Sequence, residues 1–160
     1  MKYPEFKDAD ELIAFMNKHI LDIVEDMTSG NWAKDKYIAE IHEKEGPTNE
    51  YDETYGLSYE DRRGYSDHIV EYREDISDEE ISNWIRSGDS KLAEETAEDV
   101  ETIIEAIKAN KEFANKVVQN KCTDEEDELI DKGKDPITIT AINNGLNDND
   151  SINFLYESLV

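Results

Sequence analysis

Apolar positions in the first 45 residues recur at intervals of three and four, which predicts helices. The first predicted helix follows Asp8 and Asp10, which suit a helix N-cap, and ends before Gly30. A second is predicted over 32–44, because Gly46 and Pro47 stop it. The inward face of the first helix is predicted to hold Leu12, Ile13, Met16, Ile20, Ile23, Val24 and Met27. The inward face of the second is predicted to hold Trp32, Tyr37, Ile38 and Ile41.

The middle of the chain alternates a polar stretch with renewed helical spacing. Residues 48–58 are polar and interrupted by Gly56, which indicates a loop. Ser66 suits the N-cap of a segment that contains Ile69, Val70 and Tyr72. The run Ser77-Asp78-Glu79-Glu80 is a capping box that predicts a helix containing Ile81, Trp84 and Ile85 and closed by Gly88.

The longest predicted helix runs from about Ser90 to Asn120, with a bend near Asn110. Its inward stripe is predicted to hold Ala93, Ala97, Val100, Ile104, Ile107, Phe113 and Val117.

The last forty residues contain three shorter elements. Thr123-Asp124-Glu125-Glu126 is a second capping box, and the helix it starts ends at Gly133. Pro136 suits the first turn of a helix with Ile137, Ile139 and Ile142, although Ile-Thr-Ile-Thr also fits a strand edge. Residues 151–160 repeat with helical spacing. The sequence therefore predicts an all-α fold, a compact bundle of six to eight helices in a single domain, 1–160, with a subdomain break near 46–58 as the alternative.

Charge changes this picture more than any motif does. The chain carries 41 acidic and 17 basic residues, a formal net charge of −24, whereas solubility asks for a magnitude of about 2 to 8 in a small domain. The excess is spread along the chain, at −5 for 1–45, −9 for 46–90, −7 for 91–133 and −3 for 134–160. A disordered acidic tail on a neutral domain is therefore excluded, and a folded body with an acidic exterior is expected.

The composition also indicates the cellular compartment in which the protein is expected to act. The opening Met1-Lys2-Tyr3-Pro4-Glu5 lacks the apolar core of a signal peptide, and no apolar run approaches a membrane span. The single cysteine, Cys122, cannot form an intrachain disulfide and suits a reducing compartment. We therefore expect a cytoplasmic protein with no membrane partner and no cofactor, and the oligomeric state stays open, a homodimer included.

The sequence departs from each catalytic or metal-binding motif at an identifiable residue. His19, His42 and His68 have no second histidine at helical zinc spacing. A calcium loop from Asp148 would need glycine where Asn153 stands and glutamate where Leu159 stands. No glycine-rich phosphate loop or nucleophile elbow occurs, and the acids after Cys122 are expected to raise the pKa of its thiol. The sequence thus predicts a non-enzyme with no metal site, and its charge disfavours direct binding of nucleic acid.

Acidic residues are dense on two segments that we predict to contact a partner. Six of these acids fall within twelve residues of the long helix. At a rise of about 1.5 Å per residue, they give about one charge per 3 Å. This spacing is close to the roughly 3.4 Å between phosphates of one DNA strand. The segment from Glu50 to Glu80 mixes tyrosines with carboxylates, which accept bidentate hydrogen bonds from arginine. The long-helix residues are Glu94, Glu95, Glu98, Asp99, Glu101 and Glu105. The others are Tyr51, Asp52, Glu53, Tyr55, Tyr59, Glu60, Asp61, Glu71, Glu74, Asp75, Asp78 and Glu79.

In charge character, as in Glu94 to Glu105 and Ser77-Asp78-Glu79-Glu80, the chain resembles the acidic DNA mimics of phage and mobile elements. Those proteins inhibit restriction enzymes, CRISPR nucleases or other DNA-binding proteins. The resemblance covers the whole chain and includes no motif, so it transfers no residue roles. It implies a mode of action, in which the chain occupies the cationic nucleic-acid channel of its partner.

Two alternatives remain open beside this hypothesis. An immunity or antitoxin protein would bind one cognate cationic nuclease toxin. An enzyme or housekeeping domain with a salt-adapted surface would need molar salt to fold, and the thirteen lysines weigh mildly against it.

Self-repulsion among the acids predicts a specific pH response. If the carboxylates face solvent, lowering the pH from about 7 to about 5 relieves their repulsion, and the melting temperature is expected to rise. Differential scanning calorimetry at fixed ionic strength measures this. A melting temperature that falls steadily over the same interval would show that the acids are paired within the fold.

Overall fold

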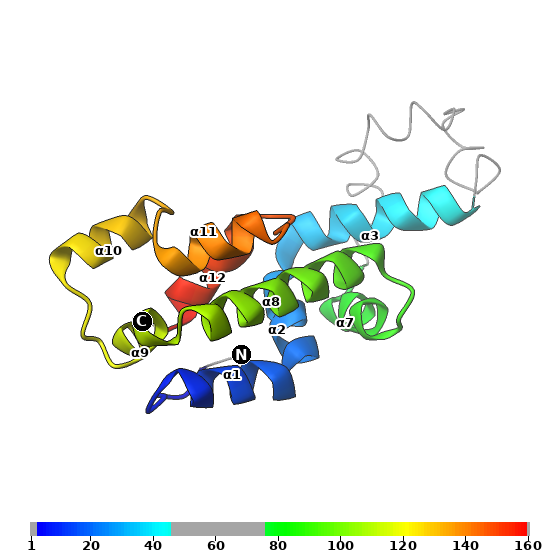
Figure 1. The fold of residues 1–160 in the computed structure, drawn as a ribbon. Helices are drawn as coiled ribbons and strands as arrows, with labels where there is room; N and C mark the ends of the chain where they lie inside the picture. The colour runs from blue at the N-terminus through cyan, green and yellow to red at the C-terminus, as the bar shows by residue number, and fades with distance from the viewer. Residues whose placement is uncertain (1–2, 46–75, 160) are drawn as a thin grey trace. The chain divides into compact units, whose positions relative to one another are not determined.

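A computed structural model describes residues 3–45 and 76–159, with the backbone alone described at residues 31, 38 and 41–45. Every regular element in these ranges is a helix, so the all-α class is confirmed there, and residues 136–142 are helical and not a strand (Figure 1). None of these helices is both long enough and apolar enough to span a bilayer. The helices are α1 (Ala9–Lys18), α2 (Ile20–Met27), α3 (Gly30–Glu45), α7 (Asp78–Arg86), α8 (Lys91–Ala109), α9 (Lys111–Val118), α10 (Asp124–Asp131), α11 (Pro136–Asn143) and α12 (Asp150–Ser158).

The chain divides into two compact units. One comprises 1–27 and 95–160, and the other comprises 28–94, so the boundary falls inside α8 between Glu94 and Glu95. The single-domain expectation stays a prediction. The alternative break near 46–58, the loop at 48–58 and the segment after Ser66 lie outside the described residues.

Side chains cap the helices where the sequence predicts it. Ser77 Oγ accepts a hydrogen bond from Glu80 N at 3.1 Å at the start of α7. At α10 the capping box is complete, because Thr123 Oγ1 accepts from Glu126 N at 3.2 Å and Glu126 Oε1 accepts from Thr123 N at 3.0 Å. These hydrogen bonds, with Lys116 Nζ 3.3 Å away, hold the pKa of the Glu126 carboxyl below its usual range. Gly88 and Gly133 follow α7 and α10 with positive φ, as helix-terminating glycines do.

Two predicted helices are interrupted. The bend expected near Asn110 is a break between α8 and α9, where Asn110 leaves helical geometry and its Nδ2 donates to Ala106 O at 2.9 Å and Thr140 Oγ1 at 3.0 Å. The single helix expected up to Gly30 is wrong, because it breaks at His19. The His19 ring packs on Phe15, with ring centroids 4.7 Å apart, and its Nδ1 lies 3.2 Å from Asp22 Oδ2. These contacts stabilise the corner between α1 and α2.

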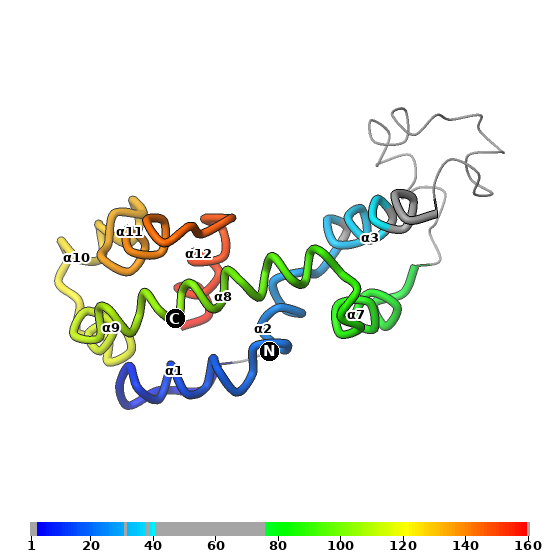
Figure 2. The backbone as a smooth tube through the Cα atoms, turned by 45° about the vertical axis from the view of Figure 1, so that its right-hand side comes forward, coloured from blue at the N-terminus to red at the C-terminus, as the bar shows by residue number. Residues whose placement is uncertain are grey.

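The larger unit is organised by α1 and α11 packing on α9 (Figures 1 and 2). Asn115 Oδ1 of α9 accepts from Ala9 N at 2.7 Å, and Gln119 Nε2 donates to Lys7 O at 3.0 Å, which fixes the start of α1 against α9. The buried apolar core of this unit includes Tyr3, Ala9, Leu12, Ile13, Met16, Ile23, Val24, Val100, Ile103, Ile104, Ala106, Ile107, Ala114, Ile137, Ala141, Ile152 and Leu155.

The smaller unit pairs α3 with α7. Tyr37 of α3 meets Trp84 of α7 edge to face at a centroid distance of 5.1 Å. Glu40 Oε1 accepts from Leu92 N at 3.0 Å, so an α3 carboxylate satisfies a backbone donor at the start of α8. The inward placement of Trp32 is wrong, because this side chain is 45% exposed and the neighbouring Ala33 fills the buried position.

A buried polar network ties α11 to α12. The Asp135 side chain is fully buried and caps α11, accepting from Thr138 N at 3.1 Å and from Thr138 Oγ1 at 2.6 Å. The Tyr156 hydroxyl of α12 donates to Asp135 Oδ2. Burial, and then the hydrogen bond and charge of Asp135, raise the pKa of Tyr156.

Alkaline pH is expected to unfold the larger unit. Burial, and then the charge of Asp26, raise the pKa of Tyr3 to about 12, and the pKa of Tyr156 is raised as well. Because the folded state holds both protons more tightly than the unfolded chain, the free energy of unfolding falls once the pH exceeds about 10. Tyrosinate absorbance and circular dichroism should therefore change together at high pH. Both tyrosines ionising in a chain that keeps its helical signal would contradict this.

Candidate functional site

The exposed acids of α8 that lie in the larger unit form the candidate site. Of the six α8 carboxylates predicted to contact a partner, Glu95, Glu98, Glu101 and Glu105 are exposed in this unit, and Glu94 is exposed in the smaller unit. Glu98, Glu101 and Glu105 fall at helical spacing on one face, opposite the buried positions. Over about 15 Å of helix the four exposed acids of the larger unit give one charge per about 5 Å. We call Glu98, Glu101 and Glu105, which lie in the larger unit, the α8 acidic row.

Asp99 corrects the prediction. Asp99 is only 3% exposed. Its carboxylate accepts hydrogen bonds from Asn147 N at 2.8 Å and from Ser151 Oγ at 3.2 Å. It thereby fixes the loop between α11 and α12 against α8. Asp99 is buried because it lies one helical turn before Ile103, at the edge of the buried face of α8. Asp99 is a structural carboxylate and does not belong to the exposed surface.

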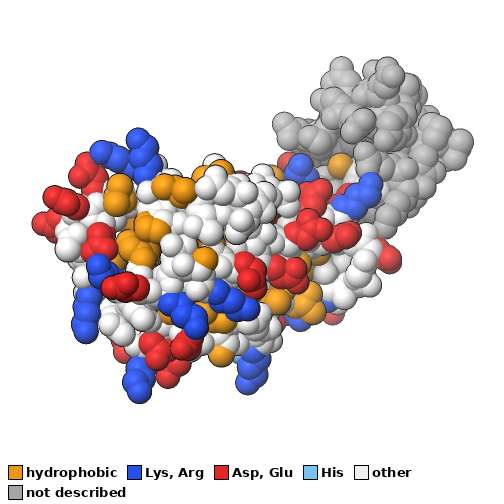
Figure 3. Space-filling view, in the orientation of Figure 1, with side chains coloured by type: hydrophobic (Ala, Val, Ile, Leu, Met, Phe, Trp, Pro, Cys, Tyr) orange, Lys and Arg blue, Asp and Glu red, His pale blue; other side chains and the backbone are white. Residues whose placement is uncertain are grey.

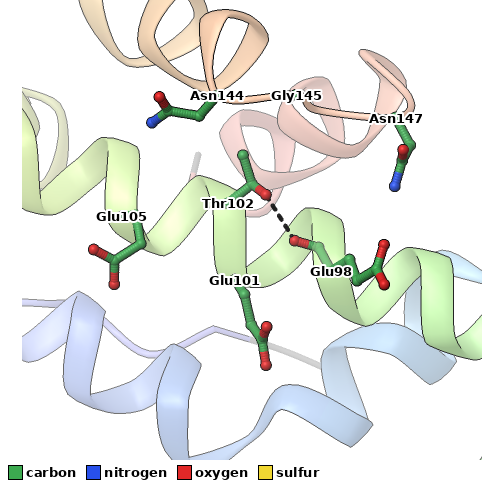
Figure 4. Close-up of a pocket in the computed structure, with 7 residues that line it drawn as sticks. All are labelled: Glu98, Glu101, Thr102, Glu105, Asn144, Gly145 and Asn147. Atoms are coloured by element: carbon green, nitrogen blue, oxygen red, sulfur yellow. Dashed lines mark hydrogen bonds between the residues drawn. The ribbon is translucent and has the colours of Figure 1, made fainter.

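A hollow of about 670 Å³ adjoins the α8 acidic row. Its α8 side is lined by the three glutamates of the row and by Thr102, whose Oγ1 donates to Glu98 O at 2.9 Å (Figure 4). The loop after α11 contributes Asn144, Gly145 and Asn147. Among the described residues, the charged side chains that line the hollow are all glutamates. The side-chain amides of its asparagines supply further carbonyl acceptors, so the hollow suits cationic side chains that donate hydrogen bonds.

Lysine neutralises part of this acidic surface. Lys108 Nζ lies 3.0 Å from Glu105 Oε1, and both side chains are well exposed. A comparable pair joins Lys132 Nζ to Glu128 Oε1 at 2.7 Å. Exposed pairs of this kind are worth at most about 1 kcal/mol, so an incoming arginine can displace the lysine.

Only two predicted contact residues of the tyrosine-rich segment lie in the described part of the chain. Asp78 and Glu79 are exposed in the first turn of α7, where carboxylates also favour the helix N-terminus. Both belong to the smaller unit, whereas the α8 acidic row belongs to the larger one. The remaining predicted residues lie outside the described ranges, namely Tyr51, Asp52, Glu53, Tyr55, Tyr59, Glu60, Asp61, Glu71, Glu74 and Asp75.

The groups that suggest metal or thiol chemistry are placed as follows. Among the described side chains no cluster of three or more His, Cys, Asp or Glu has the arrangement of a metal site. The pKa of the Cys122 thiol is raised, first by burial and then by Glu126 and Asp127. The predicted direction is confirmed, although burial is a larger cause than the neighbouring acids. The thiol therefore stays protonated near neutral pH and is a poor nucleophile.

Sequence reasoning missed three carboxylates that hold helices in place. The capping role of Asp135 could be predicted from the sequence, because an acid directly before Pro136 suits an N-cap followed by proline at the first helical position. Asp99 lies beside the apolar stripe, but the partners that bury it, Asn147 and Ser151, lie 48 and 52 residues later in the chain. Glu40 carried no local signal, since its backbone partner lies 52 residues away in the chain.

Comparison of the chain with protein-family models, with curated proteins and with solved structures finds no match.

Proposed function

We propose that this protein is a non-enzymatic inhibitor that mimics nucleic acid and binds the cationic DNA- or RNA-binding surface of its target. A restriction nuclease or a CRISPR nuclease in the host cytoplasm is the kind of target that fits. The observation that supports this most is the set of exposed carboxylates along α8 in the larger unit. They give one negative charge per about 5 Å of helix, the same order as the roughly 3.4 Å between phosphates on one DNA strand.

The hollow beside the α8 acidic row adds a second support. Proteins grip phosphates chiefly through arginine and lysine, and arginine forms paired hydrogen bonds with carboxylate as it does with phosphate. Glu98, Glu101 and Glu105 supply such acceptors, and they line the hollow together with the amides of Asn144 and Asn147. A cationic channel could therefore meet this surface with the same side chains that it uses for nucleic acid.

An immunity protein for a cationic nuclease toxin is the second candidate, because it would use the same surface. The two differ in selectivity. An immunity protein binds one cognate enzyme, whereas a mimic of the nucleic-acid backbone competes with DNA for several basic proteins.

Capture from a native host lysate tests the proposal. The tagged chain is immobilised at about 50 mM salt and eluted with a salt gradient, because the many ion pairs of a mimic weaken steeply as salt rises. We expect the captured proteins to be basic and to handle nucleic acid. Capture of no basic protein would reject the proposal, and capture of a single toxin would favour the immunity protein.

A further inference from the structure

A second surface of the larger unit is apolar, although the chain as a whole is acidic. Ile139 and Ile142 of α11 are 46% and 44% exposed, and Leu129 of α10 is 38% exposed. Hydrophobic side chains gather over α10 and α11 at the upper left of Figure 3, bordered by charged ones. We call Leu129, Ile139 and Ile142 the α10–α11 apolar patch.

Helix α11 is apolar on two faces. Ile137, Thr138 and Ala141 are buried against the unit, whereas Ile139 and Ile142, one turn apart, lie on the exposed side. A helix face that carries exposed isoleucines is normally covered by another surface. The described residues, 3–45 and 76–159, supply no such cover for this face of α11.

The face is held firmly in position. Asp135 caps α11, the Tyr156 hydroxyl anchors that cap to α12, and Asn110 Nδ2 donates to Thr140 Oγ1. Fixed on both flanks, the exposed isoleucines form a preorganised surface, which lowers the entropy cost of binding.

The surrounding charge indicates what covers the patch. Helix α10, which carries Leu129, has five exposed acidic side chains, Asp124, Glu125, Asp127, Glu128 and Asp131, one of which pairs with Lys132. A second copy would bring the same carboxylates against them. Three partly exposed side chains also offer much less area than the roughly 800 Å² per partner of a stable dimer. A cationic segment with apolar side chains of its own meets both the isoleucines and the acids.

We propose that the α10–α11 apolar patch docks an amphipathic basic helix of the cationic target, an inference that rests on the proposed function. The apolar side of that helix covers Ile139, Ile142 and Leu129, and its lysines or arginines reach the α10 carboxylates. The carboxylates of α8 supply salt-sensitive attraction, whereas the patch supplies contact that salt does not screen.

Two synthetic peptides of about 18 residues test this on the full chain. One places leucine and lysine on opposite helical faces, and the other keeps the lysines but replaces every leucine by serine. Isothermal titration calorimetry should give at least about tenfold tighter binding of the leucine peptide, with the difference retained at about 0.5 M salt. Methyl NMR should place its shifts at Ile139 and Ile142. Equal affinities, or shifts located elsewhere, would overturn the inference.

Matched variants sharpen the result. Ile139→Gln/Ile142→Gln should weaken the leucine peptide about tenfold, whereas Leu21→Gln, which removes an equally exposed side chain from α2, should not. The methyl shifts of the unaltered protein keep the test valid if a variant fails to fold. Concentration-dependent dimers that the double variant abolishes would overturn the inference in favour of a second copy.

The same variants separate this inference from the proposed function. If captured basic proteins bind the double variant unchanged, the docking inference fails and the proposed function stands. If the leucine peptide maps to α11 but the lysate yields no basic protein, the proposed function fails while the chemistry of the patch stands.

Discussion

The triple variant Glu98→Gln/Glu101→Gln/Glu105→Gln is expected to bind a captured basic target about 100-fold more weakly at low salt. Each glutamine keeps the shape of the side chain but removes the charge, and each lost ion pair at an interface costs about 1 kcal/mol. The dependence of log Kd on log salt should also flatten, by up to about one unit for each lost contact. Fluorescence anisotropy over a salt series measures both effects.

A control with the same net charge isolates the contribution of position. Glu5→Gln/Glu112→Gln/Glu157→Gln removes three exposed acids from other parts of the larger unit. We expect it to weaken binding less than about fivefold, through reduced long-range attraction alone. Equal losses in the two triple variants would show that net charge matters and the carboxylates of α8 do not.

Asp135→Ala is expected to lower the free energy of unfolding by about 3 kcal/mol. The substitution removes the cap of α11, at about 1 kcal/mol, and leaves the buried hydroxyls of Thr138 and Tyr156 without this acceptor, at about 1 to 3 kcal/mol. Asn retains the capping oxygen, so Asp135→Asn should cost less. Urea denaturation followed by circular dichroism gives the values.

Asp131→Ala is the matched control, because this acid is exposed at the end of α10. The free energy of unfolding of this variant should differ from that of the unaltered protein by less than about 0.5 kcal/mol. A loss below about 1 kcal/mol for Asp135→Ala would mean that the α11–α12 network contributes little.

Local signals explain which parts of this fold were predictable. The capping boxes at Ser77 and Thr123 and the glycines after α7 and α10 are encoded within a few residues, and the structure has them where the sequence predicts them. The corner at His19 depends on a ring contact with Phe15 that periodicity does not show, since the apolar positions continue in phase through the break. The predicted inward placement of Trp32 is wrong because a small residue, Ala33, fills the buried position beside it.

The candidate site was predictable as a charge pattern and not in its packing. Helical spacing identified the exposed glutamates of α8 correctly, but the burial of Asp99 depends on the loop at Asn147 and Ser151, which returns about fifty residues later. The hollow beside Glu98 depends on the same loop, so spacing alone could not reveal it. The sequence predicts Ile139 and Ile142 in the helix that begins at Pro136, but only the fold shows that both side chains face outward.

Competition with nucleic acid tests the central claim most directly. A captured basic protein is first bound to this chain at about 50 mM salt, and a DNA or RNA duplex that the target itself recognises is then titrated in. The account predicts full displacement, with an apparent affinity of the chain that falls in proportion to the nucleic acid added. A ternary complex in which the target holds both ligands at once would contradict it.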